Sequence, residues 1–138
     1  MPPSLVPLRQ RLSTFAVWGA VVGVAFFGIY PTTNWWAGQR AQHYALYLPQ
    51  ELAVPFWPRW IWLYLSMYVL FGLPPFGLNP PALRRLAREL IVATVLAGLV
   101  FVLWPAKLGF ARVLPDDAFY ARLFAGLFAL DRPHNLVP

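Results

Sequence analysis

The chain has 138 residues, of which 59% are hydrophobic and 12% charged, and its formal net charge is +6. A soluble domain carries roughly 25% charged residues, so this chain has too little polar surface to cover a globule in water. It has no cysteine, which excludes disulfides, thiol nucleophiles and cysteine-ligated metals. We therefore expect an all-α integral membrane protein that needs no cofactor and no metal.

The first long apolar run covers residues 12–30 and predicts a membrane-spanning helix. Two arginines precede it, as in a signal peptide, but the run is too long for one and carries Trp18 where a cleavage site needs small residues. We interpret the run as a retained anchor. Within it, Gly19 and Gly23 form a G-x-x-x-G step. This step either brings another helix close or reflects how common small residues are in membrane helices.

The segment after the first run is rich in Trp, Tyr and Pro, with Trp35, Trp36, Trp57 and Trp60 near the ends of the apolar runs. Indole rings favour the headgroup region because they combine an apolar body with one polar group. The segment therefore predicts an interfacial belt with a short re-entrant or surface helix. The alternative interpretation is a loop that recognises a lipid.

Two further apolar runs predict the second and third spans, at residues 60–78 and 90–104. Pro74 and Pro75 limit the regular part of the second run, and Pro105 ends the third. The third run is short, but basic side chains at its two ends can extend toward the interfaces. None of the three predicted spans holds an ionisable residue, which argues against a transporter.

The basic residues lie in clusters beside the apolar runs, which is typical of topology signals and not of a nucleic-acid surface. Arg9 and Arg11 precede the first run, and a predicted loop between the second and third runs carries Arg84, Arg85 and Arg88. The positive-inside rule places both clusters in the cytoplasm. The long segment between the first two runs, where Arg40 and Arg59 are set against Glu51, is then outside.

These assignments divide the chain into three parts. Residues 1–11 are a cytoplasmic N-terminus, residues 12–104 a three-span membrane region, and residues 105–138 a segment at the outer face of a plasma or inner membrane. In that outer segment Pro115, Asp116 and Asp117 favour the start of a helix, since acidic residues suit the first turn. Apolar residues then recur every three or four positions, at Phe119, Leu123, Phe124, Leu127 and Phe128. This spacing predicts a helix of about fourteen residues that lies on or dips into the membrane.

Polar residues flank this predicted helix on both sides. Before it, Lys107 and Arg112 are two cations separated by Gly109, a pattern suited to holding a phosphate. The alternative is that Lys107 only extends to the interface and Arg112 meets lipid phosphates. After the helix come four polar residues: Asp131, Arg132, His134 and Asn135.

The order of these segments, W-P-A-K-L-G-F-A-R, an apolar helix and L-D-R-P-H-N-L-V-P, resembles the type 2 phosphatidic acid phosphatase superfamily. The resemblance is to its branch of inositol phosphorylceramide synthase-like and inositol phosphotransferase-like proteins. Asp131, Pro133 and Asn135 match the lead-in to the second signature, Pro-Ser-x-His, whose Pro would be Pro138. Lys107 and Arg112 match the first signature of that branch, although Val113 stands where the wider superfamily has Pro.

The resemblance implies half of a six-helix bundle and a phosphoryl-transfer mechanism. In that mechanism one His attacks phosphorus, an Asp orients it, and a second His protonates the leaving oxygen. Of the phosphate-holding cations this chain can supply Lys107 and Arg112, whereas Arg132 is expected at a helix end or headgroup and His134 in a structural role. We therefore expect the N-terminal part of a lipid-phosphate phosphatase or phosphotransferase, catalytically incomplete as this chain. Its substrate would be a phosphorylated lipid or isoprenoid. The alternative is a small non-catalytic membrane protein that acts as a helix-packing or lipid-binding partner.

Overall fold

The computed structural model describes residues 6–106, 109 and 112–130. In this part of the chain every regular element is helical, and the only pairing of extended backbone is an isolated parallel bridge between Tyr44 and Ala106. The elements in chain order are α1 (Leu8–Gly38), η2 (Pro49–Ala53), η3 (Pro58–Trp60), α2 (Ile61–Gly72), α3 (Pro74–Gly77), α4 (Pro80–Leu103) and α5 (Ala118–Leu130). The predicted all-α class is thus confirmed.

α1 is longer than the predicted span at residues 12–30, since its 31 residues continue past Pro31 to Gly38. Proline lacks the N–H that a helix interior needs, yet α1 runs through Pro31, so the predicted end of the helix at Tyr30 is wrong. Directly after Pro31, the hydroxyls of Thr32 and Thr33 donate to the carbonyl oxygens of Gly28 and Ile29, at 2.6 and 2.9 Å. The first residues of the predicted Trp-rich loop therefore belong to α1.

α4 begins ten residues before the predicted third span, so the predicted loop with its arginines is also wrong. The side-chain oxygen of Asn79 accepts a hydrogen bond from the Ala82 N–H at 3.0 Å and caps the helix. Pro80 and Pro81 occupy the first two positions, where a missing N–H does no harm. The arginine cluster consequently lies on the first turns of α4, where Arg85 and Glu89 form an i,i+4 ion pair at 2.7 Å.

The predicted second span at residues 60–78 is divided into two helices. α2 has 12 residues and ends at Gly72, and α3 is a separate turn of four residues that starts at Pro74. The break follows from Pro74 and Pro75, because a residue that precedes proline is disfavoured in helical conformation. Two helices in the described part of the chain, α1 and α4, are long and apolar enough to cross a membrane, and α2 does not reach that length.

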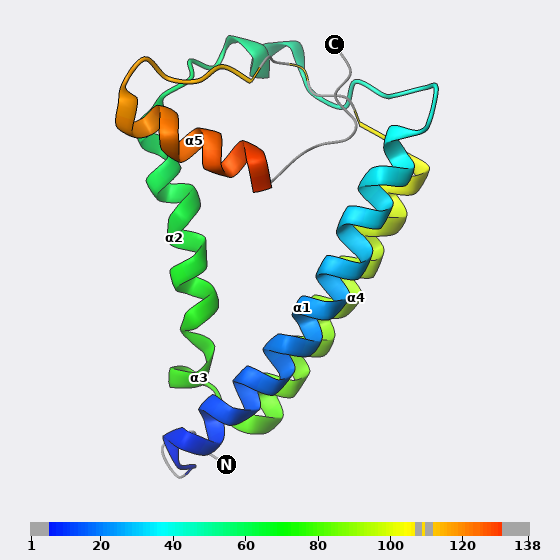
Figure 1. Ribbon diagram of the computed structural model, residues 1–138. Coiled ribbons are helices and arrows are strands. Elements are labelled where there is room, and N and C mark those ends of the chain that lie inside the picture. The colour runs from blue at the N-terminus through cyan, green and yellow to red at the C-terminus, as the bar shows by residue number, and fades with distance from the viewer. Residues whose placement is uncertain (1–5, 107–108, 110–111, 131–138) are drawn as a thin grey trace.

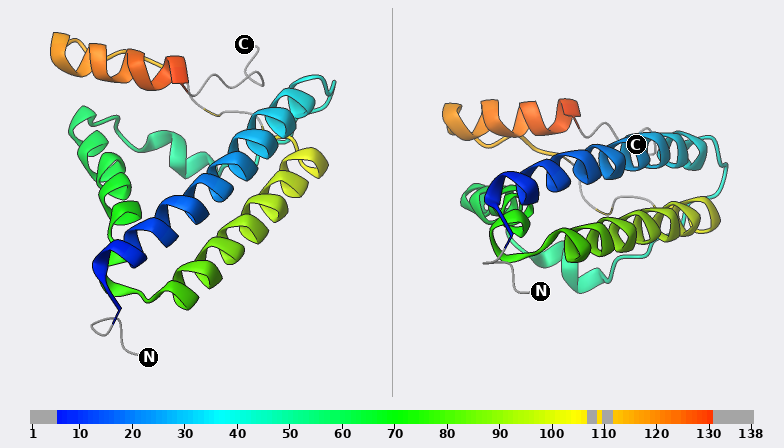
Figure 2. Two further views of the ribbon diagram at one scale, coloured as in Figure 1. Left: turned by 60° about the horizontal axis from the view of Figure 1, so that its bottom comes forward. Right: turned by 90° about the horizontal axis from the view of Figure 1, so that it is seen from below.

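α1 and α4 lie side by side and run in the same direction, and the short α2 runs in the opposite direction at some distance from them (Figures 1 and 2). We call the end where α1 and α4 end the upper end, as drawn in Figure 1, and the opposite end the lower end. α3 joins α2 to the pair at the lower end. There the Arg11 guanidinium of α1 donates to the carbonyl oxygen of Phe76 at 3.0 Å.

The contact between α1 and α4 depends on small residues. Ala37 of α1 is 1% exposed and Ala87 of α4 is 5% exposed. A side chain at Gly98 would place its Cβ only 2.7 Å from Cγ2 of Ile29, so a larger residue has no room there. Gly19 and Gly23, in contrast, have no neighbouring atom within 4 Å of such a Cβ. The G-x-x-x-G step is therefore not the contact between these helices.

The predicted helix of about fourteen residues after Pro115 is confirmed as α5, which has 13 residues. Asp117 caps it, since its side-chain oxygen accepts from the N–H groups of Phe119 and Tyr120, both at 3.0 Å. In the Trp-rich segment, where a short re-entrant or surface helix is predicted, the structure has two short 3₁₀ helices, η2 and η3. These elements and α5 form a layer across the upper end (Figure 1).

Candidate functional site

The segment that carries Lys107 and Arg112 in the sequence leaves α4 at the upper end and leads to α5. Its first residues are fixed by the loop that follows α1. The Tyr44 N–H donates to the carbonyl oxygen of Pro105 at 2.8 Å, and Tyr44 and Ala106 form the isolated bridge. Pro105 is buried and Tyr44 is 46% exposed, and this bond ties the end of α4 to the loop.

Gly109 packs closely against the loop. A Cβ at Gly109 would lie 2.8 Å from Cδ2 of Leu52 and 2.8 Å from two ring carbons of Tyr47. A ring is a rigid neighbour, so a larger residue would force the segment and the loop apart. The glycine between the two predicted phosphate-holding cations is thus needed for packing, a role that its position in the sequence did not indicate.

Arg112 is half-buried, and its guanidinium carbon lies 5.0 Å from the centre of the Phe128 ring on α5. A cation over an aromatic face is attracted by the negative charge of the ring face. The hydrogen-bond donors of a guanidinium point outward in its own plane, so stacking on a ring is compatible with a planar contact to a phosphate. The contact therefore helps to hold the guanidinium in place on α5.

α5 is held over the upper end by two aromatic contacts. The Phe124 ring meets Phe56 of the loop edge to face at 5.2 Å between centres. Phe119 stacks on Trp62 of α2 at 6.3 Å. Since the contact of Arg112 is made with α5, these rings also determine where Arg112 lies relative to α2.

Of the site residues predicted from the sequence, the structure places Arg112. Seven others lie outside the described residues: Lys107, Asp131, Arg132, Pro133, His134, Asn135 and Pro138. The predicted pairing of two cations therefore stays a prediction. Within the described ranges, no group of three His, Asp or Glu side chains is arranged to hold a metal ion.

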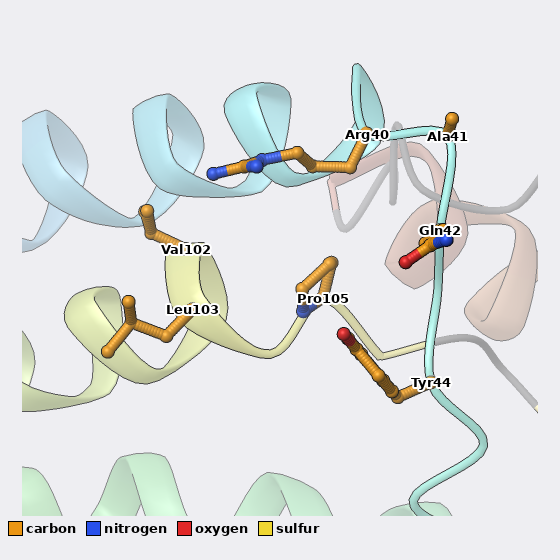
Figure 3. A pocket seen from close by; sticks show the side chains of 7 residues that line it. All are labelled: Arg40, Ala41, Gln42, Tyr44, Val102, Leu103 and Pro105. Atoms are coloured by element: carbon orange, nitrogen blue, oxygen red, sulfur yellow. The ribbon is translucent and has the colours of Figure 1, made fainter.

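The structure also contains a cavity of about 310 Å³ that the sequence analysis missed, between the loop after α1 and the last turn of α4 (Figure 3). Three polar side chains line it: Arg40, Gln42 and Tyr44. Four small or apolar residues complete the wall: Ala41, Val102, Leu103 and Pro105. In the sequence analysis Arg40 serves only to assign the side of the membrane. The sequence feature that could have indicated the cavity is a run of hydrogen-bond donors directly after a spanning helix.

Among the described residues, the upper end carries Arg112 on the Phe128 ring and Arg40 in the cavity beside Gln42 and Tyr44. His43 has a buried Nε2 with no hydrogen-bond partner among the described residues. Comparison of the chain with family models, with curated proteins and with solved structures gives no match in any of the three.

Proposed function

We propose that this chain supplies the membrane-embedded, phosphate-holding part of a lipid-phosphate phosphatase or phosphotransferase. The observation that carries the proposal is the contact of Arg112, a half-buried cation, with the Phe128 ring of α5, a helix that lies at the level of the upper ends of both long apolar helices (Figure 1). A guanidinium at that level suits the phosphate of a membrane lipid. The resemblance of the flanking segments to the phosphatase superfamily supplies the reaction class.

The proposal includes a third span formed by residues 58–77. α2 alone is about 18 Å long at 1.5 Å per residue, which is shorter than a hydrocarbon core of about 30 Å. η3 and α3 extend it at either end, and together they run between the two ends of the α1–α4 pair (Figure 1). In a plasma or inner membrane, the arginines on the first turns of α4 favour a cytoplasmic lower end and an outer upper end.

In this assignment Lys107 and Arg112 bind the phosphate oxygens and offset the charge that develops during transfer. The attacking His and the protonating His belong to the third and second signatures, which the 138 residues do not contain. The residues around Pro138 would then lead into the second signature. The spans that carry these signatures would pack on α2, whose side chains are exposed.

Lipid binding and turnover by the purified chain test the proposal together. In micelles of a neutral detergent, phosphatidic acid should bind, and phosphate release should stay at background. Arg112→Gln should weaken binding about tenfold, the effect of losing hydrogen bonds from a charged group. Arg122→Gln is the matched control, since Arg122 is an exposed arginine on α5 and should have no effect. Turnover by the chain alone, or equal losses in both variants, would contradict the proposal.

The nucleotide sequence after the codon for Pro138 is a second test, which needs no protein. The proposal expects Ser-x-His directly, then further apolar spans and a His-x-x-x-Asp segment. A stop codon in the frame, with no such segment in any frame, would rule out the catalytic assignment.

One observation favours a second candidate function, a non-catalytic membrane protein that packs against or binds a partner. α2 exposes apolar side chains around its circumference, including Leu63 at 62% and Val69 at 66%. Such a helix can serve a permanent partner as well as a second half of an enzyme. Stable expression of the chain alone, together with one partner that co-purifies at a fixed ratio, would favour this candidate.

A further inference from the structure

We propose that the cavity at the upper end of the α1–α4 pair binds the phosphate group of an anionic phospholipid. The cavity brings together the loop that follows α1 and the last turn of α4, which are about sixty residues apart in the chain (Figure 3). None of its described lining residues belongs to the phosphate site proposed above. This inference therefore does not rest on the proposed enzyme function.

The polar wall of the cavity consists of Arg40, Gln42 and Tyr44, which provide three kinds of hydrogen-bond donor. Arg40 contributes a planar guanidinium, Gln42 an amide and Tyr44 a hydroxyl. In Figure 3 the Arg40 side chain runs back from the end of α1 toward Val102 and does not extend away from the helices. No carboxylate is among the described lining residues, so the cation has no internal counter-ion in the cavity. A ligand with a negative charge and several acceptor oxygens fits this wall.

The apolar wall distinguishes a lipid from a free anion. Val102 and Leu103 lie in the last turn of α4, and Leu103 is 61% exposed. In Figure 3 the Val102 side chain points up toward the guanidinium of Arg40. A phosphodiester that carries acyl chains satisfies both walls, because the phosphate meets the donors while a chain lies along α4. Inorganic phosphate makes no use of the apolar wall.

The level of the cavity along the helices also fits a lipid headgroup. Trp36 and Trp104 mark the ends of α1 and α4, and both rings are about half exposed. Tryptophan favours the boundary between acyl chains and headgroups. The guanidinium carbon of Arg40 lies 6.0 Å from the centre of the Trp36 ring, so the cation is held at this boundary.

The cavity is preorganised on its loop side. The 2.8 Å bond from the Tyr44 N–H to the Pro105 carbonyl fixes the backbone of Tyr44 beside the end of α4. A ligand therefore does not need to order this part of the loop in order to bind, which favours affinity.

Native mass spectrometry of the whole chain in a neutral detergent tests the proposal with dioleoylphosphatidylglycerol as the probe. We expect one lipid to bind per chain at low lipid ratios. Arg40→Gln should reduce the affinity about tenfold and Tyr44→Phe about threefold, since the first removes a charge and the second one hydroxyl donor. Arg59→Gln is the matched control, because Arg59 is an exposed arginine in the same region that does not line the cavity.

Three further outcomes decide between sources of the negative charge. Dioleoylphosphatidylcholine should bind at least about fivefold more weakly, because its net charge is zero. Inorganic phosphate at millimolar concentration should not displace the lipid; displacement would mean a site for free anions and would overturn the lipid assignment. Equal losses in Arg40→Gln and Arg59→Gln would mean general attraction to positive charge and would also overturn it. Tyr44→Phe is the more conservative variant because it keeps the ring. It therefore tests the cavity even if Arg40→Gln does not fold.

Discussion

The α1–α4 pair and α2 are all apolar helices, and α2 carries no charged residue, yet the pair and α2 have very different surroundings. In the pair, Leu83 and Ala87 are at most 5% exposed, and Gly98 leaves room only for the side chains of α1. In α2, the one buried residue is Ile61 at its first turn. The difference teaches that apolar sequence places a helix in a membrane, whereas close contact between helices requires small residues at the right positions.

The physical reason is that lipid tails are as apolar as leucine side chains. An exposed apolar face in lipid is not driven into contact, so packing has to come from shape and from polar groups. α1 and α4 have both, since Gly98 admits Ile29 and the Arg88 guanidinium lies 5.8 Å from the Trp18 ring centre. α2 carries large side chains on its outward faces and is joined to the pair through α3.

The largest effect is expected from Gly98→Leu, which breaks the pair itself. Even a Cβ at this position would lie 2.7 Å from Ile29 and 3.2 Å from Thr33, so the helices must separate. We expect the free energy of unfolding in detergent to fall by about 3 kcal/mol, the upper range for overpacking. Helix content measured by circular dichroism during titration with a denaturing detergent gives this value.

Gly28→Leu is the control for this prediction. Gly28 directly precedes Ile29 on α1, but no neighbouring atom lies within 4 Å of a Cβ at Gly28. This variant should change the free energy of unfolding by less than about 0.5 kcal/mol. If both variants are equally destabilised, Gly98 is not the contact that holds the pair.

An intermediate effect is expected from Asp117→Ala, which tests whether α5, the helix that contacts α2, unfolds independently of the α1–α4 pair. The variant loses the cap that accepts hydrogen bonds from Phe119 and Tyr120, which is worth about 1 kcal/mol to a helix. Hydrogen exchange in the first turns of α5 should become about fivefold faster. Asp116→Ala should leave exchange unchanged, since the side chain that accepts from the first N–H groups of α5 is that of Asp117. Faster exchange across α1 and α4 as well would show that α5 is not an independent unit.

The smallest effect is expected from Val69→Ala on the open face of α2. Val69 is 66% exposed, so its truncation leaves no cavity inside the described part of the chain. The free energy of unfolding of the chain alone should change by less than about 0.5 kcal/mol. A decrease of more than about 1 kcal/mol in the free energy of unfolding would mean that the face of α2 that carries Val69 is packed against another part of the chain.

The errors in the predicted elements have local causes. The pattern of apolar residues located the centres of α1 and α4, but it missed how far the helices continue through polar residues. α1 runs through Pro31 to Gly38, and the Asn79 cap starts α4 ahead of its arginines. Arginine is a good helix former, so a charged segment beside an apolar run continues the helix as readily as it forms a loop.

Composition and periodicity determined by themselves that this chain is helical and that its surface is apolar, because those properties are sums over side chains. They also determined α5, since the Asp117 cap and the three- and four-residue spacing are local signals. Only the tertiary structure decided which apolar helices touch, that Gly98 and not Gly19 is the close contact, and that Arg40 shares a cavity with Val102. These are contacts between residues far apart in the chain, and their geometry depends on how the helices and loops meet in three dimensions.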